Sequence, residues 1–140
     1  MEDHMKLALS QFGIKEIVGA EHNPEVLKYF QDLGFDASSL TDETAWCSAF
    51  ANWVARRSGL EYSKKLNARS WMDMGIEETT PEQGDIVVFW RVSKTSWKGH
   101  VGFYVNETDT HINVLGGNQG NMVCIKPYPK SRLLMYRRLT

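Results

Sequence analysis

The pattern of apolar and polar positions changes period along the chain, from helical in the first part to extended in the second. Bulky apolar side chains recur at three- and four-residue spacing within residues 46–54, and Gly59 follows the run. A shorter run with the same spacing follows Asn23-Pro24, a pair suited to a helix start, and reaches Gly34. The spacing predicts two helices, whose inward-facing positions are Val26, Leu27, Phe30 and Leu33, and Trp46, Ala49, Phe50, Trp53 and Val54. Thr41, Asp42 or Thr44 is suited to capping the second helix.

Beyond Pro81 the pattern becomes that of strands. The turn at residues 81–84 precedes an apolar, β-branched run at 85–90, which predicts a buried strand. Further strands are predicted at 100–106, 112–115, 122–126 and 133–137, whereas 61–80 is ambiguous, with a short helix near 68–72. Helices followed by a run of strands predict an α+β fold, with N-terminal helices packed on an antiparallel sheet of about five strands.

Length and charge limit the functional classes. A chain of 140 residues fits a single domain over 1–140, and its net charge of −1 gives no electrostatic reason to bind nucleic acid or an anionic membrane. No apolar run is long enough to span a bilayer. The N-terminus lacks the features of a secretion signal, and we expect synthesis in the cytoplasm without a signal peptide.

The two cysteines, Cys47 and Cys124, are too few for a disulfide scaffold or a cysteine-rich zinc site. We expect both thiols to be free, with Cys124 packed in the core. No cluster of His, Asp or Glu has the spacing of a zinc site, and the glycine pair at 116–117 does not open a helix as a phosphate loop does. We therefore expect no metal and no cofactor.

Cys47 is the candidate nucleophile because it falls in the first turn of the strongest predicted helix. Free backbone N–H groups and the helix dipole favour a thiolate there, and the same N–H groups suit an oxyanion. The alternative is that Cys47 is a small buried apolar residue between Trp46 and Ser48.

His100 is the candidate base among the four histidines, which also include His4, His22 and His111. We expect His4 to lie in a mobile N-terminus, His22 in a polar turn and His111 at the edge of a loop. His100 begins a strand in which Val101 and alternate residues face the core, so it points to the other face. The alternative is a surface histidine on a half-solvated strand.

Asn118 is the candidate third residue, which would orient the imidazole. If the hairpin turns at 107–111, His100 lies opposite Asn118, and a shorter turn would place Gly117 there instead. Glycine-flanked Asn is also common in turns, so orientation of His100 and pure turn chemistry are both open. Asp85, after a glycine turn, is interpreted as a structural acceptor that fixes its loop.

Taken in order, these segments resemble the CHAP family of cysteine, histidine-dependent amidohydrolases/peptidases. The segment TAWCSAFANW at 44–53 resembles the family's nucleophile helix, and GDIVVF at 84–89 resembles its first strand. The segment GHVGF at 99–103 resembles its histidine strand, and VLGGNQ at 114–119 resembles the strand that ends with the orienting polar residue. Many members carry a Glu shortly before the Asn, but here Gly116 and Gly117 occupy that stretch.

The resemblance implies a papain-like fold and a cysteine peptidoglycan hydrolase, an amidase or endopeptidase that cleaves the peptide stem or cross-bridge through Cys47, His100 and Asn118. The groove would offer Trp46, Trp71 and Trp97 as substrate-binding candidates, although core packing is the alternative role of a tryptophan. Acidic residues upstream of Cys47 are too sparse for the calcium loop of some members, which again implies no metal. The alternatives are a non-catalytic wall-binding or interaction module on the same fold, and a cysteine protease or acyltransferase with a protein substrate.

A wall substrate without an export signal implies a route to the cell wall or periplasm. Phage lysis through a holin, as for an endolysin, is one route, and a specialised secretion apparatus is another. A cognate immunity protein would be a further partner of a secreted effector. The sequence does not choose among these.

Overall fold

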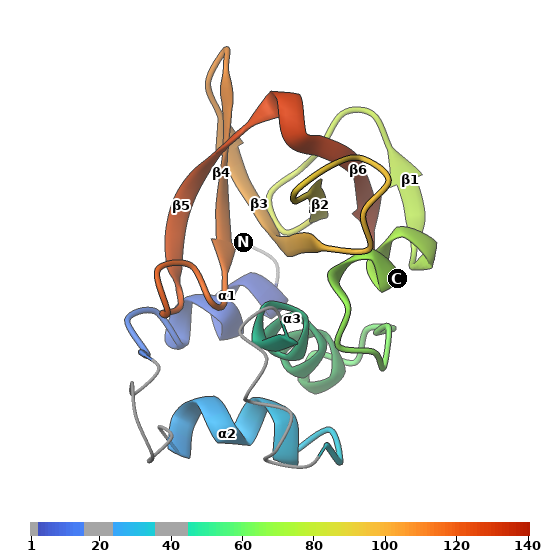
Figure 1. The fold of residues 1–140 in the computed structure, drawn as a ribbon. Coiled ribbons are helices and arrows are strands. Elements are labelled where there is room, and N and C mark those ends of the chain that lie inside the picture. Colours follow the sequence, from blue (N-terminus) through green and yellow to red (C-terminus); the bar gives the residue numbers. More distant parts are fainter. Residues whose placement is uncertain (1–2, 16–23, 36–44) are drawn as a thin grey trace.

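The computed structural model describes residues 3–15, 24–35 and 45–140, which form helices on one side of a six-stranded antiparallel sheet (Figure 1). The helices are α1 (Asp3–Ser10), α2 (Pro24–Gln31) and α3 (Ala45–Arg57), with short 3-10 helices η2 (Ala68–Asp73) and η3 (Lys130–Arg132). The strands are β1 (Ile76–Glu78), β2 (Ile86–Trp90), β3 (Gly99–Glu107), β4 (His111–Gly116), β5 (Cys124–Pro129) and β6 (Leu133–Arg138).

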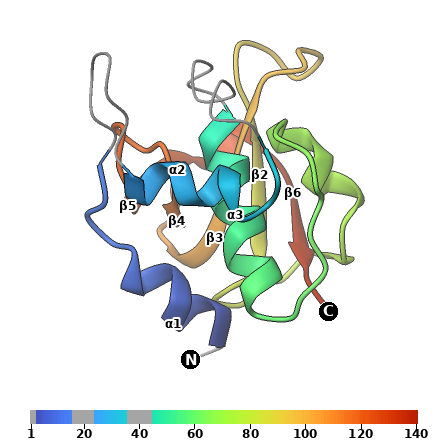
Figure 2. The ribbon, with the colours of Figure 1, turned by 90° about the horizontal axis from the view of Figure 1, so that it is seen from below.

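The sheet has the order β1-β6-β2-β3-β4-β5, and it curls so that η3 crosses from β5 to β6 (Figure 1). In the same view α1 and α3 lie directly beneath the sheet, and α2 lies beyond α3. Seen from below, α2 runs across α3, which separates it from the strands (Figure 2). None of the described helices has the length and apolar character needed to span a bilayer.

The two helices predicted from apolar spacing are confirmed as α2 and α3, because their periodic positions form the core. Val26 and Phe30 of α2 are fully buried, and the apolar positions of α3 from Trp46 to Val54 are all at most 4% exposed. The short helix expected near 68–72 is the 3-10 helix η2. The predicted caps Asn23, Thr41, Asp42 and Thr44 lie outside the described residues.

The α+β class with an antiparallel sheet is confirmed, although the sheet has six strands because β1 was not predicted. The fourth predicted strand, at 122–126, begins two residues later as β5. Its predicted first residues pair elsewhere: Met122 bridges to Lys15, and Val123 N–H donates to the Ile14 carbonyl at 2.8 Å. The N-terminus, expected to be mobile, forms α1 instead, and Nε2 of His4 lies 2.7 Å from the Gly84 carbonyl.

Both faces of the sheet are buried, which the alternation of β3 alone did not predict. Val101 and Phe103 face the helices, as expected from that alternation. The opposite face lies on the concave side of the curled sheet and holds a second apolar cluster of Val87, Phe89, Tyr104, Ile112, Val114 and Tyr136, with Tyr128 and Leu133 at its margin. A side chain of β3 that points away from the helices therefore enters a second packed interior and not solvent.

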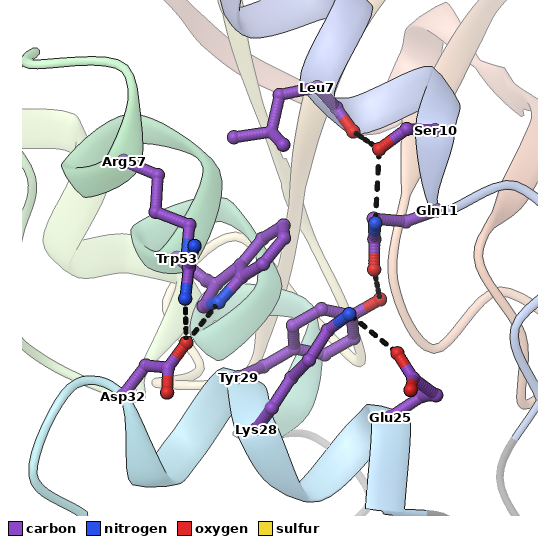
Figure 3. Close-up of polar contacts among 9 residues, drawn as sticks. All are labelled: Leu7, Ser10, Gln11, Glu25, Lys28, Tyr29, Asp32, Trp53 and Arg57. Atoms are coloured by element: carbon purple, nitrogen blue, oxygen red, sulfur yellow. Dashed lines mark hydrogen bonds and ion pairs between the residues drawn. The ribbon is translucent and has the colours of Figure 1, made fainter.

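Polar contacts tie the three helices to one another (Figure 3). Trp53 and Arg57 of α3 both donate to one carboxylate oxygen of Asp32, just beyond α2, at 2.8 and 2.6 Å. The Tyr29 hydroxyl, buried between α2 and α1, donates to Oε1 of Gln11 at 2.9 Å. The bonds of Trp53 and Tyr29 satisfy polar groups that burial would otherwise leave without partners, and all of these bonds help to set how α2 lies across α3.

The start of α3 is held by the segment that follows the helix. Ser48 Oγ donates to the Lys65 carbonyl at 2.7 Å and accepts from Trp71 Nε1 at 3.0 Å. Asn52, one turn later, donates to the same Lys65 carbonyl at 3.0 Å and accepts from the Lys64 N–H at 3.0 Å. The side chains of Ser48, Asn52 and Trp71 are fully buried. Their hydrogen bonds therefore fix the position of the first turn of α3, which contains Cys47.

Candidate active site

Cys47 lies in the first turn of α3, as the sequence predicts, but its side chain is only 2% exposed. The sulfur lies close to β3, where the backbone of Val101 forms a hydrogen bond with the Cys47 side chain. Val101 directly follows His100, so the fold brings the candidate nucleophile to the strand that carries the candidate base. Both cysteines have free thiols, as expected, and Cys124 at the start of β5 is partly exposed rather than in the core.

His100 is the second residue of β3 and is 7% exposed. Its ring stacks on that of Tyr128 of β5, with 4.8 Å between centroids and 22° between planes, and Tyr128 in turn stacks on Phe89 of β2 at 5.0 Å. The imidazole therefore packs against aromatic rings on the concave face of the sheet. Its burial excludes the alternative of a half-solvated surface histidine.

Gln119 is the polar partner of His100, with Oε1 2.9 Å from the imidazole Nε2. The Gln119 amide nitrogen donates to the carbonyls of Val114 and Cys124, at 3.0 and 2.7 Å. Because carbonyls only accept, this fixes the amide with its oxygen toward the ring. Nε2 of His100 must then carry the proton, which leaves Nδ1 as the unprotonated, basic nitrogen.

The structure places Gln119, and not Asn118, against the imidazole. The predicted register holds near His100, where Phe103 pairs with Leu115, but it shifts by one residue beyond Tyr104. β4 ends at Gly116, before the pairing could reach His100. Asn118 then adopts a left-handed backbone with φ of 58°, which favours the turn interpretation of this residue. The reversal turns the next side chain inward, and Gln119 is 1% exposed.

The two glycines before Asn118 make room for this arrangement. A Cβ on Gly116 would stand 2.6 Å from Oε1 of Gln119. A Cβ on Gly117 would stand 2.8 Å from Cβ of Phe50 and 3.0 Å from the Trp46 ring. The loop therefore packs directly on the first turns of α3, close to Cys47. The absence of side chains at Gly116 and Gly117 therefore permits this close contact.

Burial makes the uncharged forms of both reactive groups the favoured ones. It raises the pKa of the Cys47 thiol to about 11, against the smaller opposite effects of backbone hydrogen bonds from Val101 and Ser48 and of the Arg91 charge. Burial also lowers the pKa of His100 to about 4, partly offset by its bond to Gln119 and reinforced by the charges of Arg91 and Lys126. The thiolate expected from the helix start is thus not the resting form, because desolvation outweighs the local dipole.

A cavity of about 310 Å³ opens beside His100. Its described lining comes from β2 and the loop after it, the start of β3, the β4–β5 loop, β5 and η3: Phe89, Trp90, Arg91, His100, Asn118, Gln119, Gly120, Asn121, Lys126, Tyr128 and Arg132. Cys47 is not among these lining residues, so its sulfur is covered, whereas the candidate base His100 reaches the cavity.

Of the three tryptophans proposed to bind substrate, two are core residues. Trp46 is 2% exposed and lies parallel to Tyr29, whereas Trp71 is fully buried and bonded to Ser48. Their assignment to the groove was wrong, because each packs α3 against its neighbours. Trp97 is 63% exposed in the loop between β2 and β3 and remains a candidate, and Trp90 lines the cavity.

Asp85 has the structural role that the sequence predicts. Its carboxylate accepts from the Glu82 N–H at 2.8 Å and from two guanidinium nitrogens of Arg138, at 3.0 and 2.8 Å. It therefore ties the turn before β2 to the end of β6. Within the described ranges, no three His, Cys, Asp or Glu side chains gather closely enough to hold a metal ion.

Comparison with known proteins identifies a domain family but no similar curated protein. No curated protein shows significant similarity to the chain as a whole. A sequence model of the CHAP domain, however, matches residues 39–118, which is more than half of the 140 residues and includes both Cys47 and His100. The chain therefore belongs to the CHAP domain family.

Proposed function

We propose that the protein is a cysteine peptidoglycan hydrolase that cuts an amide bond of the peptide stem or cross-bridge. Cys47 is the nucleophile, His100 the general base and Gln119 the residue that orients His100. The CHAP domain supports a hydrolase of the peptidoglycan amidase or peptidase type. The residue assignment rests on the buried hydrogen bond between His100 and Gln119, because this bond leaves Nδ1 as the basic nitrogen. His100 lies on β3, the strand whose Val101 backbone contacts the Cys47 thiol.

The reaction starts from a neutral thiol and a neutral imidazole. As the sulfur attacks the carbonyl carbon of the amide, Nδ1 of His100 takes the thiol proton. Backbone N–H groups at the start of α3 are suited to receive the negative charge on the carbonyl oxygen. The imidazolium then gives its proton to the leaving amine, and water, deprotonated by His100, releases the acyl group from sulfur. Gln119 Oε1 accepts from Nε2–H throughout, and this bond strengthens when the ring is charged.

The buried sulfur places one requirement on this reaction. Cys47 is 2% exposed and does not line the cavity, so a substrate carbonyl that lies against His100 must displace neighbouring atoms to reach Sγ. We propose that substrate binding opens this short path. A scaffold that only bound the wall would not need a thiol at a fixed helix start against the strand that carries an oriented imidazole.

The deciding experiment is incubation of purified peptidoglycan with the wild-type protein, Cys47→Ala and Cys124→Ser, followed by mass analysis of the fragments. We expect new amine and carboxyl termini with the wild type and Cys124→Ser, and none with Cys47→Ala. Cys124→Ser is the matched control because its hydroxyl can still donate to the Gln119 carbonyl, as the thiol does at 3.3 Å. The fragment masses also identify the bond that is cut.

Other outcomes would favour the other functions. Wall binding without fragments would favour the binding module, and cleavage of a peptide or protein but not of peptidoglycan would favour a protease. The site of action at the wall, and delivery by a holin or a secretion apparatus, stay part of the proposal.

A further inference from the structure

Three cationic side chains line the cavity next to His100. Arg91 comes from the loop after β2, Lys126 from β5 and Arg132 from η3, so three separate segments bring positive charge to one place. No Asp or Glu is among the described lining residues. In a chain whose net charge is −1, this is a local concentration and not a general excess of positive charge.

These three cations have no carboxylate partner among the described residues, unlike four other cations of the chain. Lys28, Arg57, Lys130 and Arg138 each form an ion pair with an Asp or Glu. Around the cavity, by contrast, Arg132 lies 5.3 Å from the Trp90 ring centre and Lys126 lies 5.9 Å from that of Tyr128. Contacts with ring faces position the charges but leave their hydrogen-bond donors available for a ligand.

The charges also act on the reactive groups. Arg91 contributes to the lowered pKa of His100 and opposes the raised pKa of Cys47, and Lys126 contributes to the lowered pKa of His100. An anion bound among these side chains would offset their effect and make the imidazole a stronger base. Binding and chemistry would then be coupled through charge.

We propose that Arg91, Lys126 and Arg132 form a carboxylate-binding subsite, which selects peptides that carry a free carboxylate near the amide bond to be cut. This inference rests on the proposed function, since it names the form of the peptide stem that the site accepts. Arginine is suited to a carboxylate because its guanidinium offers two parallel donors, and lysine adds a further charge. A stem whose carboxylates are amidated would present no charge to the subsite.

The test measures binding to the Cys47→Ala variant, which cannot turn the ligand over. The two probes are the tetrapeptide L-Ala-γ-D-Glu-L-Lys-D-Ala and the same peptide with its carboxylates converted to carboxamides. At low ionic strength we expect amidation to weaken binding by about tenfold or more, the size expected for a charge-assisted hydrogen bond. Adding Arg91→Gln, Lys126→Gln and Arg132→Gln together should remove the preference, so that both peptides bind equally weakly.

The matched control removes three exposed charges elsewhere, with Lys6→Gln, Arg56→Gln and Lys65→Gln in the same background. This variant should keep the full preference for the carboxylate form. Equal binding of the two peptides to the parent, no binding of either, or equal loss of preference in both triple variants would overturn the subsite.

The fragment analysis of peptidoglycan tests the proposed function independently of these binding measurements. A carboxylate preference without cleavage by the wild type would refute the hydrolase and keep the subsite. Cleavage without the preference would keep the hydrolase and refute the subsite.

Discussion

Gln119 and His100 form a buried pair in which the amide oxygen lies 2.9 Å from Nε2, while the amide nitrogen is held by the carbonyls of Val114 and Cys124. The direction of the amide therefore sets the tautomer of the imidazole. A loop residue outside the strands thus decides which nitrogen of His100 is unprotonated.

Gln119→Ala should lower kcat by as much as ~100-fold, because the ring loses the bond that fixes its orientation. Gln119→Glu keeps an acceptor next to Nε2 but adds a negative charge, so it should raise the pKa of His100 and move the acidic limb of the pH–rate profile to higher pH. The profile separates positioning from simple loss of fold, which would lower activity equally at every pH.

Asn118→Gly is the neighbouring control for this prediction. Glycine adopts the left-handed backbone of residue 118 without strain, so we expect the pH–rate profile of the wild type. A shifted profile in Asn118→Gly, with none in Gln119→Glu, would return the orienting role to Asn118.

Cys47 of the free protein should react slowly with alkylating reagents. Burial raises the pKa of its thiol to about 11, so in a Cys124→Ser background alkylation by iodoacetamide should be slow at pH 7. Its rate should rise as the pH increases from 9 toward 11. Rapid alkylation that levels off below pH 7 would show a thiolate–imidazolium pair at rest, contrary to the effect of burial.

Acid should destabilise the protein through His100 before most carboxylates titrate. The folded pKa is lowered to about 4, below the ordinary value near 6.5, so the stabilisation is present above pH 6.5 and is lost as the pH falls toward 4. The loss over this window is up to about 3 kcal/mol in the free energy of unfolding. Urea unfolding measured from pH 7.5 to 4 would show it.

The control for the acid effect is His100→Gln, a side chain that cannot take up a proton. Its stability should change less over the same pH range. The same slope in the variant would assign the acid sensitivity to other groups.

Gly117→Ala should destabilise the protein by roughly 1–3 kcal/mol, since the added methyl would meet the Trp46 ring at 3.0 Å and Cβ of Phe50 at 2.8 Å. Combination with Trp46→Phe, which removes part of the ring, should restore some of that loss. Additive effects in the double-mutant cycle of melting temperatures would argue against contact between the loop and α3.

Local patterns predicted the larger elements correctly because each carries its own evidence. The apolar spacing of α3 predicts a helix without knowledge of what the helix packs against, and the β-branched residues of β2 predict a strand in the same way. Short elements were missed for the opposite reason: α1 contributes few buried side chains, such as Met5 and Ala8, and is fixed by contacts with distant residues, including His4 with Gly84. The three residues of β1 depend on pairing with β6.

For the site, the sequence by itself determined the reactive residue types and their order: Cys47 at a helix start, His100 at the head of a strand and an amide in the loop after the next strand. Only the tertiary structure decided which amide reaches the ring, because after the left-handed turn at Asn118 it is the next residue, Gln119, that contacts the imidazole. It also decided the charge of the pair. A helix start favours a thiolate through nearby dipoles, but the desolvation that opposes it depends on how α3, β3 and β5 close around both groups, which no local pattern records.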